Sequence, residues 1–186
     1  MQREEIKLKG TSPLMVHAEL LSNPLSPLKK EIAEFTSKRK KTDDDWAQIF
    51  RIEWEGGLYF KDVPIMPGNA IKATIRSSAK LSRRGRHIQR GVQILEPEVP
   101  LEYNGPKSKD RMWDSGNYHD IRSVVVQGSR VMRCRPIFRE WALTFTLLVN
   151  ETIMDMQEVL DIIRLGGEIE GLCENRMNGY GRYEIV

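Results

Sequence analysis

The longest apolar run of the chain, residues 141–149, most constrains its fold. It reads Trp-Ala-Leu-Thr-Phe-Thr-Leu-Leu-Val, with an apolar side chain at every second position. A run of this length is typical of a buried strand and falls far short of the ~20 residues that a transmembrane helix needs. We therefore expect a sheet protein that does not span a membrane.

Further strands are predicted at both ends of the chain and before its longest apolar run. Residues 3–9 alternate aliphatic with charged side chains, and residues 180–186 form the last predicted strand. Residues 124–132 place Gln-Gly between two valine-rich stretches, which predicts a hairpin. Residues 58–60 are expected to form a short strand or an extended segment.

Helical spacing predicts two long helices, over residues 70–81 and 155–165, the second ended by Gly166-Gly167. Two further helical segments, near residues 31–35 and from Thr42 to Gly56-Gly57, belong to a helical insertion at about 23–57. A second insertion, a long loop followed by the hairpin, is expected at about 96–140. The pattern predicts an α+β fold in one domain, 1–186: a modified ferredoxin-like or RRM-like sheet with helices on one face.

Charge is strongly segregated along the sequence. The formal net charge is only +3, from 29 Lys and Arg against 26 Asp and Glu, but residues 72–90 hold seven cations and residues 121–139 hold five, with no acid in either window. A third basic run is Lys38-Arg39-Lys40-Lys41. Concentrated cations neutralise phosphates and release counterions, so we expect polyanion binding. The alternative is that each run is only a solvated face.

The remaining composition predicts neither cofactor nor metal. Cys134 and Cys173 stand alone, without the spacing of a zinc site or of a disulfide framework, so both are interpreted as structural. The first residues, Met-Gln-Arg-Glu-Glu-Ile-Lys, lack the apolar core of a signal peptide. A cytoplasmic location is the resulting expectation.

Two motifs carry a resemblance to a known family. Residues 65–76, Ile-Met-Pro-Gly-Asn-Ala-Ile-Lys-Ala-Thr-Ile-Arg, resemble the Pro-Gly motif of the RAMP superfamily of CRISPR-associated proteins, whose backbone-subunit branch carries an Arg four residues after the Lys. Residues 171–183, Gly-Leu-Cys-Glu-Asn-Arg-Met-Asn-Gly-Tyr-Gly-Arg-Tyr, are similar to the glycine-rich loop before the last strand of the same superfamily.

The resemblance implies a subunit that holds single-stranded RNA and that stacks head-to-tail into a filament beside other CRISPR subunits. Single-stranded DNA stays open as an alternative ligand. Physical chemistry agrees with it, because a helix N-terminus after Pro67-Gly68 can take a phosphate. Glycines at 179 and 181 admit close backbone approach, and Tyr180 can stack a base or belong to the core. The candidate nucleic-acid-binding residues are Lys38, Arg39, Lys40, Lys41, Asn69, Lys72, Arg76, Lys80, Arg83, Arg84, Arg86, Arg133, Arg135, Arg176, Tyr180 and Arg182.

Other functions stay open. In the RNA-cleaving type of backbone subunit, an acid between the first strand and the Pro-Gly motif cuts the target, and Asp43, Asp44 and Asp45 lie in that interval. Helix capping is the other explanation of these aspartates. His17 is placed like the general base of the guide-processing branch, or is structural. A metal-dependent or His-assisted endoribonuclease is thus one alternative, and a stand-alone mobile-element relative that binds single-stranded DNA or docks on a CRISPR complex is another.

Overall fold

The computed structural model describes all 186 residues, and the chain divides into two compact units. The first, which we name the sheet unit, comprises Met1–Met15, Val63–Asn104 and Phe138–Val186. The second, which we name the hairpin unit, comprises Val16–Asp62 and Gly105–Ile137. The prediction of a single domain stays a prediction. No helix in either unit has the length and apolar character that crossing a membrane requires.

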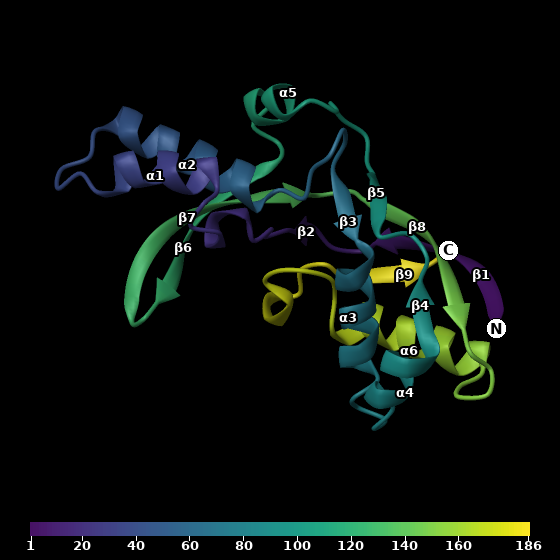
Figure 1. The fold of residues 1–186 in the computed structure, drawn as a ribbon. Helices are drawn as coiled ribbons and strands as arrows, with labels where there is room; N and C mark the ends of the chain where they lie inside the picture. Colours follow the sequence, from purple (N-terminus) through teal and green to yellow (C-terminus); the bar gives the residue numbers. More distant parts are fainter. The chain divides into compact units, whose positions relative to one another are not determined.

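The sheet unit is built on an antiparallel sheet in the order β3-β5-β8-β1-β9, with β4 also paired to β8 (Figure 1). Its central pair is β1 and β8, in which Ile6 lies opposite Phe145 and Leu8 opposite Leu143, all four buried. The strands of this unit are β1 (Gln2–Gly10), β2 (Leu14–Met15), β3 (Ile65–Pro67), β4 (Val92–Ile94), β5 (Glu98–Glu102), β8 (Ala142–Val149) and β9 (Tyr183–Ile185).

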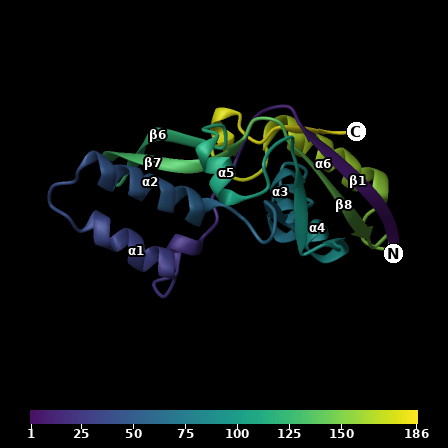
Figure 2. The same cartoon turned by 90° about the horizontal axis from the view of Figure 1, so that it is seen from above.

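The helices of the sheet unit lie on one side of its sheet, as Figures 1 and 2 show. They are α3 (Gly68–Ser78), α4 (Gly85–Gly91), α6 (Met156–Ile169) and the short 3-10 turn η2 (Arg176–Asn178). Helix α3 buries Ile71 and Ile75, and α6 buries Val159 and Ile163. The predicted fold class, α+β with an antiparallel sheet covered by helices, is confirmed.

The hairpin unit combines a helical hairpin with a strand hairpin. Helices α1 (Pro27–Thr36) and α2 (Asp43–Gly57) pack through Ile32, Ile49 and Ile52. Strands β6 (His119–Val126) and β7 (Ser129–Phe138) turn at Gln127-Gly128. Both turn residues have positive φ, 48° and 81°, as a tight hairpin turn of the right twist requires. The short elements η1 (Leu20–Ser22) and α5 (Lys109–Asp114) complete the unit.

The prediction that Gly166-Gly167 ends a helix is wrong. Both glycines lie inside α6, which continues to Ile169. A Cβ on Gly167 would lie 2.0 Å from the backbone oxygen of Tyr183, and one on Gly166 would lie 2.5 Å from Oγ of Ser78. The pair therefore permits α6 to approach β9 and α3 closely, a packing role that its sequence position does not reveal.

Other boundaries also differ from the sequence prediction. The long loop predicted from residue 96 contains strand β5 and helix α5, because alternating Val99 and Leu101 are buried despite the surrounding prolines. The helix predicted over 70–81 starts at Gly68 and ends at Ser78. The expectation of a short strand or an extended segment at residues 58–60 is met, since the chain is extended at Leu58 and Phe60 forms a β-bridge.

Candidate nucleic-acid interface

The Pro-Gly motif fixes the start of α3 against a neighbouring segment. Pro67 is the extended N-cap residue, and the N–H of Gly68 donates a 2.9 Å hydrogen bond to the carbonyl of Pro97. A Cβ on Gly68 would lie 2.3 Å from the backbone oxygen of Glu96. Only glycine fits here, because any side chain would collide with the backbone of Glu96. The next residue, Asn69, is exposed in the first turn of α3.

Helix α3 presents a cationic stripe beside its buried face. Lys72, Arg76 and Lys80 follow each other at i, i+4 spacing, which places them on one side of the helix and its C-terminal turn. The Lys72 ammonium donates to the Gln89 carbonyl at 3.2 Å and so ties α3 to α4. Arg76 and Lys80 are exposed.

The turn between α3 and α4 brings further cations to the same place. Arg83 adopts a left-handed conformation with φ of 60°, and the Arg84 N–H donates to the Ala79 carbonyl at 2.7 Å. This closes the turn tightly, so that a Cβ on Gly85 would lie 3.3 Å from Cγ of Lys80.

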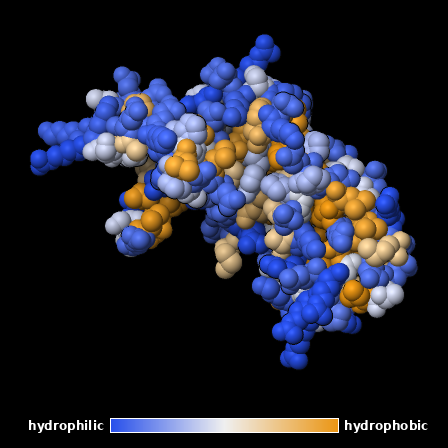
Figure 3. Space-filling view, viewed as in Figure 1, coloured by the Kyte–Doolittle hydropathy of each residue, from blue (hydrophilic) through white to orange (hydrophobic).

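Together these residues surround a hollow of about 480 Å³, which we name the cationic hollow. Its lining consists of Arg76, Lys80, Arg83, Gly85, Arg86 and Gln89. None of its four cations makes an ion pair, whereas the adjacent Arg84 pairs with Glu158 at 2.9 Å. In Figure 3 the end of the sheet unit that carries α4 is strongly hydrophilic. Four unpaired cations around an open hollow can neutralise the phosphates of a polyanion.

The glycine-rich loop before β9 is held by its own backbone. Gly171, Gly179 and Gly181 all have positive φ. A Cβ on Gly181 would lie 2.2 Å from the Leu172 carbonyl oxygen, and the Leu172 N–H donates to Gly181 at 2.9 Å. The compactness of the loop accounts for Gly181, while nothing lies within 4 Å of a Cβ on Gly179.

Three candidate residues belong to this loop. Arg182 donates from its backbone to Oγ of Ser12 at 2.8 Å and from its guanidinium to the Arg176 carbonyl at 3.3 Å. Arg176 lies 3.6 Å from Glu170. Tyr180 is half-buried. The two arginines thus brace the loop.

Both cysteines are free thiols; Cys134 is buried and Cys173 is half-buried. Cys173 lies 3.4 Å from the sulfur of Met66, and burial raises its pKa to about 12. Burial likewise raises the pKa of Cys134 to about 12. At neutral pH neither is a nucleophilic thiolate, which agrees with the structural interpretation.

The three aspartates begin α2. Thr42 and Asp45 form a capping box, each side chain accepting from the other's backbone N–H. The Lys38 ammonium lies 2.5 Å from Asp45, and this hydrogen bond, with that from the Thr42 backbone, lowers the pKa of the carboxyl. Capping is therefore confirmed for Asp45, while Asp43 and Asp44 are exposed in the same first turn.

Two of the four cations in the basic run at 38–41 make contacts within the protein at this helix start. Besides its bond to Asp45, Lys38 lies over the Phe35 ring at 5.3 Å. Lys41 donates to the Lys38 carbonyl at 2.8 Å and lies over the Trp46 ring at 5.7 Å. Arg39 and Lys40, between them, are exposed.

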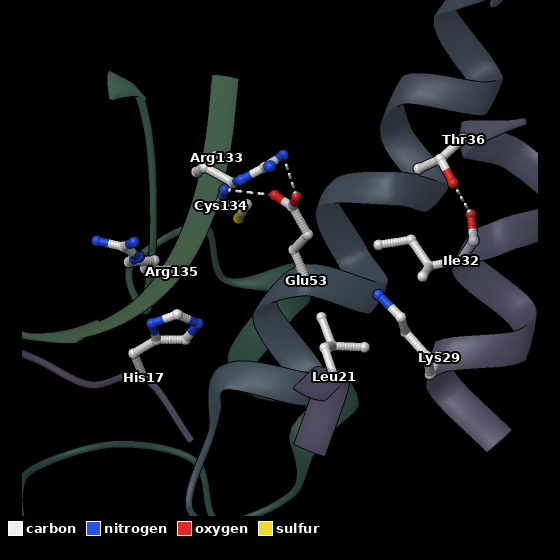
Figure 4. A pocket seen from close by; sticks show the side chains of 9 residues that line it. All are labelled: His17, Leu21, Lys29, Ile32, Thr36, Glu53, Arg133, Cys134 and Arg135. Carbon is white, nitrogen blue, oxygen red and sulfur yellow. Dashed lines mark hydrogen bonds and ion pairs between the residues drawn. The ribbon is translucent and has the colours of Figure 1, made fainter. Parts of the chain in front are cut away.

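The remaining candidates lie in the hairpin unit around an acid that the sequence did not single out. His17, Arg133 and Arg135 line a pocket of about 260 Å³ together with Glu53 (Figure 4). Glu53 accepts from the Arg133 guanidinium and from the Cys134 backbone N–H, both at 2.9 Å. Burial raises the pKa of Glu53 despite these contacts. No local pattern marks this residue, because Arg133 is 80 positions away.

The structure contains no group of three or more His, Cys, Asp or Glu side chains placed to hold one metal ion. The candidate residues divide between the two units. Those of the sheet unit lie on α3, at the cationic hollow and in the glycine-rich loop, and those of the hairpin unit lie in the segment 38–45 between α1 and α2 and in the pocket.

Comparison with known proteins identifies the fold. No family model matches the sequence, and no curated protein matches it. Among solved structures, the chain is similar to a chain in the cryo-EM structure of the type III-B Cmr-beta bound to cognate target RNA, with a TM-score of 0.59 and 10% sequence identity. The match covers 99% of this chain and 58% of that one, so the present chain spans less than two thirds of its neighbour's length. This likeness shows that the two chains share a fold. Membership of the RAMP superfamily, and of a particular branch of it, stays a prediction.

Proposed function

We propose that this chain is a RAMP-type subunit that binds single-stranded RNA, and that the cationic hollow is its main phosphate-binding surface. The observation that carries the proposal is the set of four exposed cations without acidic partners around one hollow. The hollow adjoins α3, the helix whose sequence resembles the Pro-Gly motif. Phosphate neutralisation supplies most of the sequence-independent affinity for a nucleic acid.

The choice of RNA as ligand is supported by the fold. The structurally similar chain belongs to a complex determined with cognate target RNA. The half-buried Tyr180, which belongs to the same sheet unit as the hollow, offers a ring for base stacking. We include as further contacts the other predicted residues, namely Lys38, Arg39, Lys40, Lys41, Asn69, Lys72, Arg84, Arg133, Arg135, Arg176 and Arg182.

We also propose that the chain assembles head-to-tail along the strand, beside other CRISPR subunits. The support is again the likeness to a chain of the Cmr-beta assembly. Light scattering after gel filtration tests this proposal. The mass per particle should rise in steps as single-stranded RNA of increasing length is added, and a mass of one protomer on every RNA length would contradict it.

The binding proposal is tested with a fourfold variant, Arg76→Gln, Lys80→Gln, Arg83→Gln and Arg86→Gln. Fluorescence anisotropy with a labelled single-stranded RNA bearing a 5′-hydroxyl should show an affinity loss of about 10²–10³-fold near 0.1 M salt, because four phosphate contacts are removed. A control variant, Arg3→Gln, Lys7→Gln, Lys9→Gln and Arg164→Gln, changes the net charge equally. We expect its affinity to stay within about threefold of the wild type.

Equal losses in the two variants would show that net charge, and not the hollow, governs binding. Single-stranded DNA of the same sequence serves as the second ligand. RNA should bind more tightly, and equal or tighter binding of DNA would refute the assignment to RNA.

A further inference from the structure

Strand β6 lies at the edge of its sheet, and the proposed RNA surface does not involve it. The sheet of the hairpin unit runs in the order β2-β7-β6. Figure 2 shows β7 between β6 and helix α2, with β6 on the outer side. An edge strand presents a row of N–H and C=O groups that its own sheet does not pair, and such a row is a template for another strand.

The turn of the hairpin determines which backbone groups point away from β7. Val126 and Ser129 flank the two turn residues and lie opposite each other, so the Val126 carbonyl accepts from the Ser129 N–H, as in a hydrogen-bonded turn. The direction of the backbone groups alternates along an antiparallel strand. Ile121, Ser123 and Val125 therefore direct their N–H and C=O groups outward, and we name these three residues the free edge.

The side chains of the free edge share one face of the hairpin, and this face is apolar and exposed. Val125 is 65% exposed and Ile121 is 42% exposed. Met132 lies opposite Ser123 on the same face and is also 42% exposed. In Figure 3 the β6–β7 hairpin shows a group of hydrophobic side chains. Apolar surface and outward backbone groups thus coincide at this edge.

Residues 121–126 contain none of the features that ordinarily protect an edge strand. Such features are lysine, proline, a β-bulge or a charge that points inward. The segment reads Ile-Arg-Ser-Val-Val-Val and pairs with β7 residue for residue, without a bulge. Its one charge, on Arg122, is neutralised by Asp120. An edge of this kind is expected to be covered by another strand.

We propose that β6 pairs antiparallel with β6 of a second copy of this chain, about a twofold axis at Ser123. In this register Ile121 of each copy faces Val125 of the other, and each facing pair of the free edge exchanges two hydrogen bonds. The two hairpins then form one four-stranded sheet, which is more stable than an isolated two-stranded hairpin.

The charges of β6 agree with this register and disagree with the neighbouring one. With the axis at Ser123, Arg122 lies opposite Val124 of the other copy, and Asp120 lies opposite Val126. No like charges meet. An axis at Arg122 would place two arginines directly opposite each other, which is destabilising.

The chemistry of the free edge favours a protein strand over RNA as its partner. Donors and acceptors alternate along the edge, and another strand offers the complementary alternation. The phosphates of RNA offer acceptors only, so they would leave the carbonyls of the edge unpaired. Every copy of the chain carries the same edge, so two copies form a self-complementary pair.

This contact does not rest on the proposed function. The cationic hollow belongs to the sheet unit, whereas β6 belongs to the hairpin unit. A twofold contact uses the same surface on both copies and ends at two, which distinguishes it from head-to-tail assembly.

Sedimentation equilibrium of the full chain without RNA tests the proposal. A contact one strand wide belongs to the small, transient interfaces, so we expect a monomer–dimer equilibrium with a dissociation constant on the order of 10 µM. A wild type that stays a monomer about twentyfold above that concentration would overturn the proposal. A series of species larger than the dimer would overturn it as well, because a twofold contact closes.

A lysine on the free edge should break the dimer. Val125→Lys places a charge against the apolar Ile121 of the other copy and should raise the dissociation constant by about tenfold or more. Leu25→Lys makes a matched change at a residue of the hairpin unit that is 76% exposed and lies outside β6. It should stay within about twofold of the wild type. Equal effects of the two substitutions would contradict the contact, and thermal unfolding verifies that both variants are folded.

A cysteine on the twofold axis tests the register. Residues in a hydrogen-bonded antiparallel pair have Cα atoms about 5.5 Å apart, within the reach of a disulfide. Ser123→Cys should therefore give a covalent dimer with oxidised glutathione, visible on a non-reducing gel. Ser129→Cys, an exposed site on β7, is the control and should give little. Cys134 and Cys173 are present in both variants. Equal amounts of covalent dimer would overturn the register about Ser123.

The fourfold variant of the cationic hollow separates this contact from RNA binding. It should lose affinity for RNA and keep the dimer, and loss of the dimer would overturn the proposal. If the wild type dimerises but does not bind RNA, only the proposed function fails. A wild type that is monomeric, and whose RNA affinity falls in Val125→Lys, would assign the free edge to RNA and overturn the pairing of two copies.

Discussion

Residues 72–90 and 121–139 look alike as sequences, since each is rich in cations and free of acids, yet their cations have different surroundings in the structure. In the first window Arg76, Lys80, Arg83 and Arg86 have no acidic partner. In the second, Arg122 pairs with Asp120 and Arg133 with Glu53. A count of charges within one sequence window therefore omits the acidic partners that lie outside the window. Only unpaired cations retain their full charge for a ligand.

The largest effect on stability should come from removing the distant acid of the second window. Glu53→Ala leaves the buried Cys134 N–H unsatisfied and releases Arg133, which should lower the free energy of unfolding by about 1–3 kcal/mol. Urea denaturation measures it. The matched variant in the first window, Glu158→Ala, breaks the exposed pair with Arg84 and should cost about 0–1 kcal/mol. If the two variants were equally stable, the distinction between the windows would fail.

A charge-matched pair of variants tests the same distinction in binding. Arg83→Gln with Arg86→Gln should weaken single-stranded RNA binding about 25-fold near 0.1 M salt, because two phosphate contacts are lost. Arg122→Gln with Arg130→Gln should weaken it no more than about fivefold, because Arg122 is neutralised by Asp120 and only Arg130, bonded to the Ser123 hydroxyl, keeps its charge. Anisotropy titrations with a 5′-hydroxyl RNA compare them, and the reverse order would contradict the assignment.

Neighbours within one turn sharpen the comparison further. Arg84 is paired with Glu158, whereas Arg83 beside it is not. Arg83→Gln alone should lower RNA affinity about fivefold, and Arg84→Gln should lower it by a smaller factor. The dissociation constants of the two variants for one RNA are compared in the same buffer. A larger loss of RNA affinity in the Arg84 variant would show that a cation paired with an acid still binds RNA.

The smallest expected effect concerns the third basic run. The hydrogen bond from Lys38 holds the pKa of Asp45 below its ordinary 3.8. The stability that the pair contributes is therefore present above pH 3.8 and is lost as the pH falls through the lowered pKa. Carboxyl NMR titration should show the midpoint of Asp45 rise in Lys38→Gln and stay in place in Arg39→Gln. An unchanged midpoint in Lys38→Gln would contradict the contact.

The parts of the fold that depend on local pattern could be predicted from the sequence. The alternation of residues 142–149 gives β8, and the spacing of Ile71 and Ile75 gives α3. The capping of α2 by Thr42 and Asp45 is a contact across three residues, so it too was predictable. What these features share is that both partners lie within one element.

Features that need a partner from elsewhere in the chain could not be predicted. Gly166-Gly167 is typical of a helix end, and only the approach of Tyr183 shows that the pair is needed within α6. The carboxylate of Glu53 meets Arg133 from 80 positions away. For the same reason the basic windows could be found from the sequence, but the division into paired and unpaired cations could not.

The salt dependence of RNA binding tests the central claim most directly. The logarithm of the affinity for a single-stranded RNA falls linearly with the logarithm of the salt concentration, by about 0.7 for each phosphate neutralised. If the four cations of the hollow each neutralise one phosphate, the fourfold glutamine variant should show a slope shallower than that of the wild type by about 2.8. Parallel lines for the two proteins would show that the hollow does not contact the phosphates.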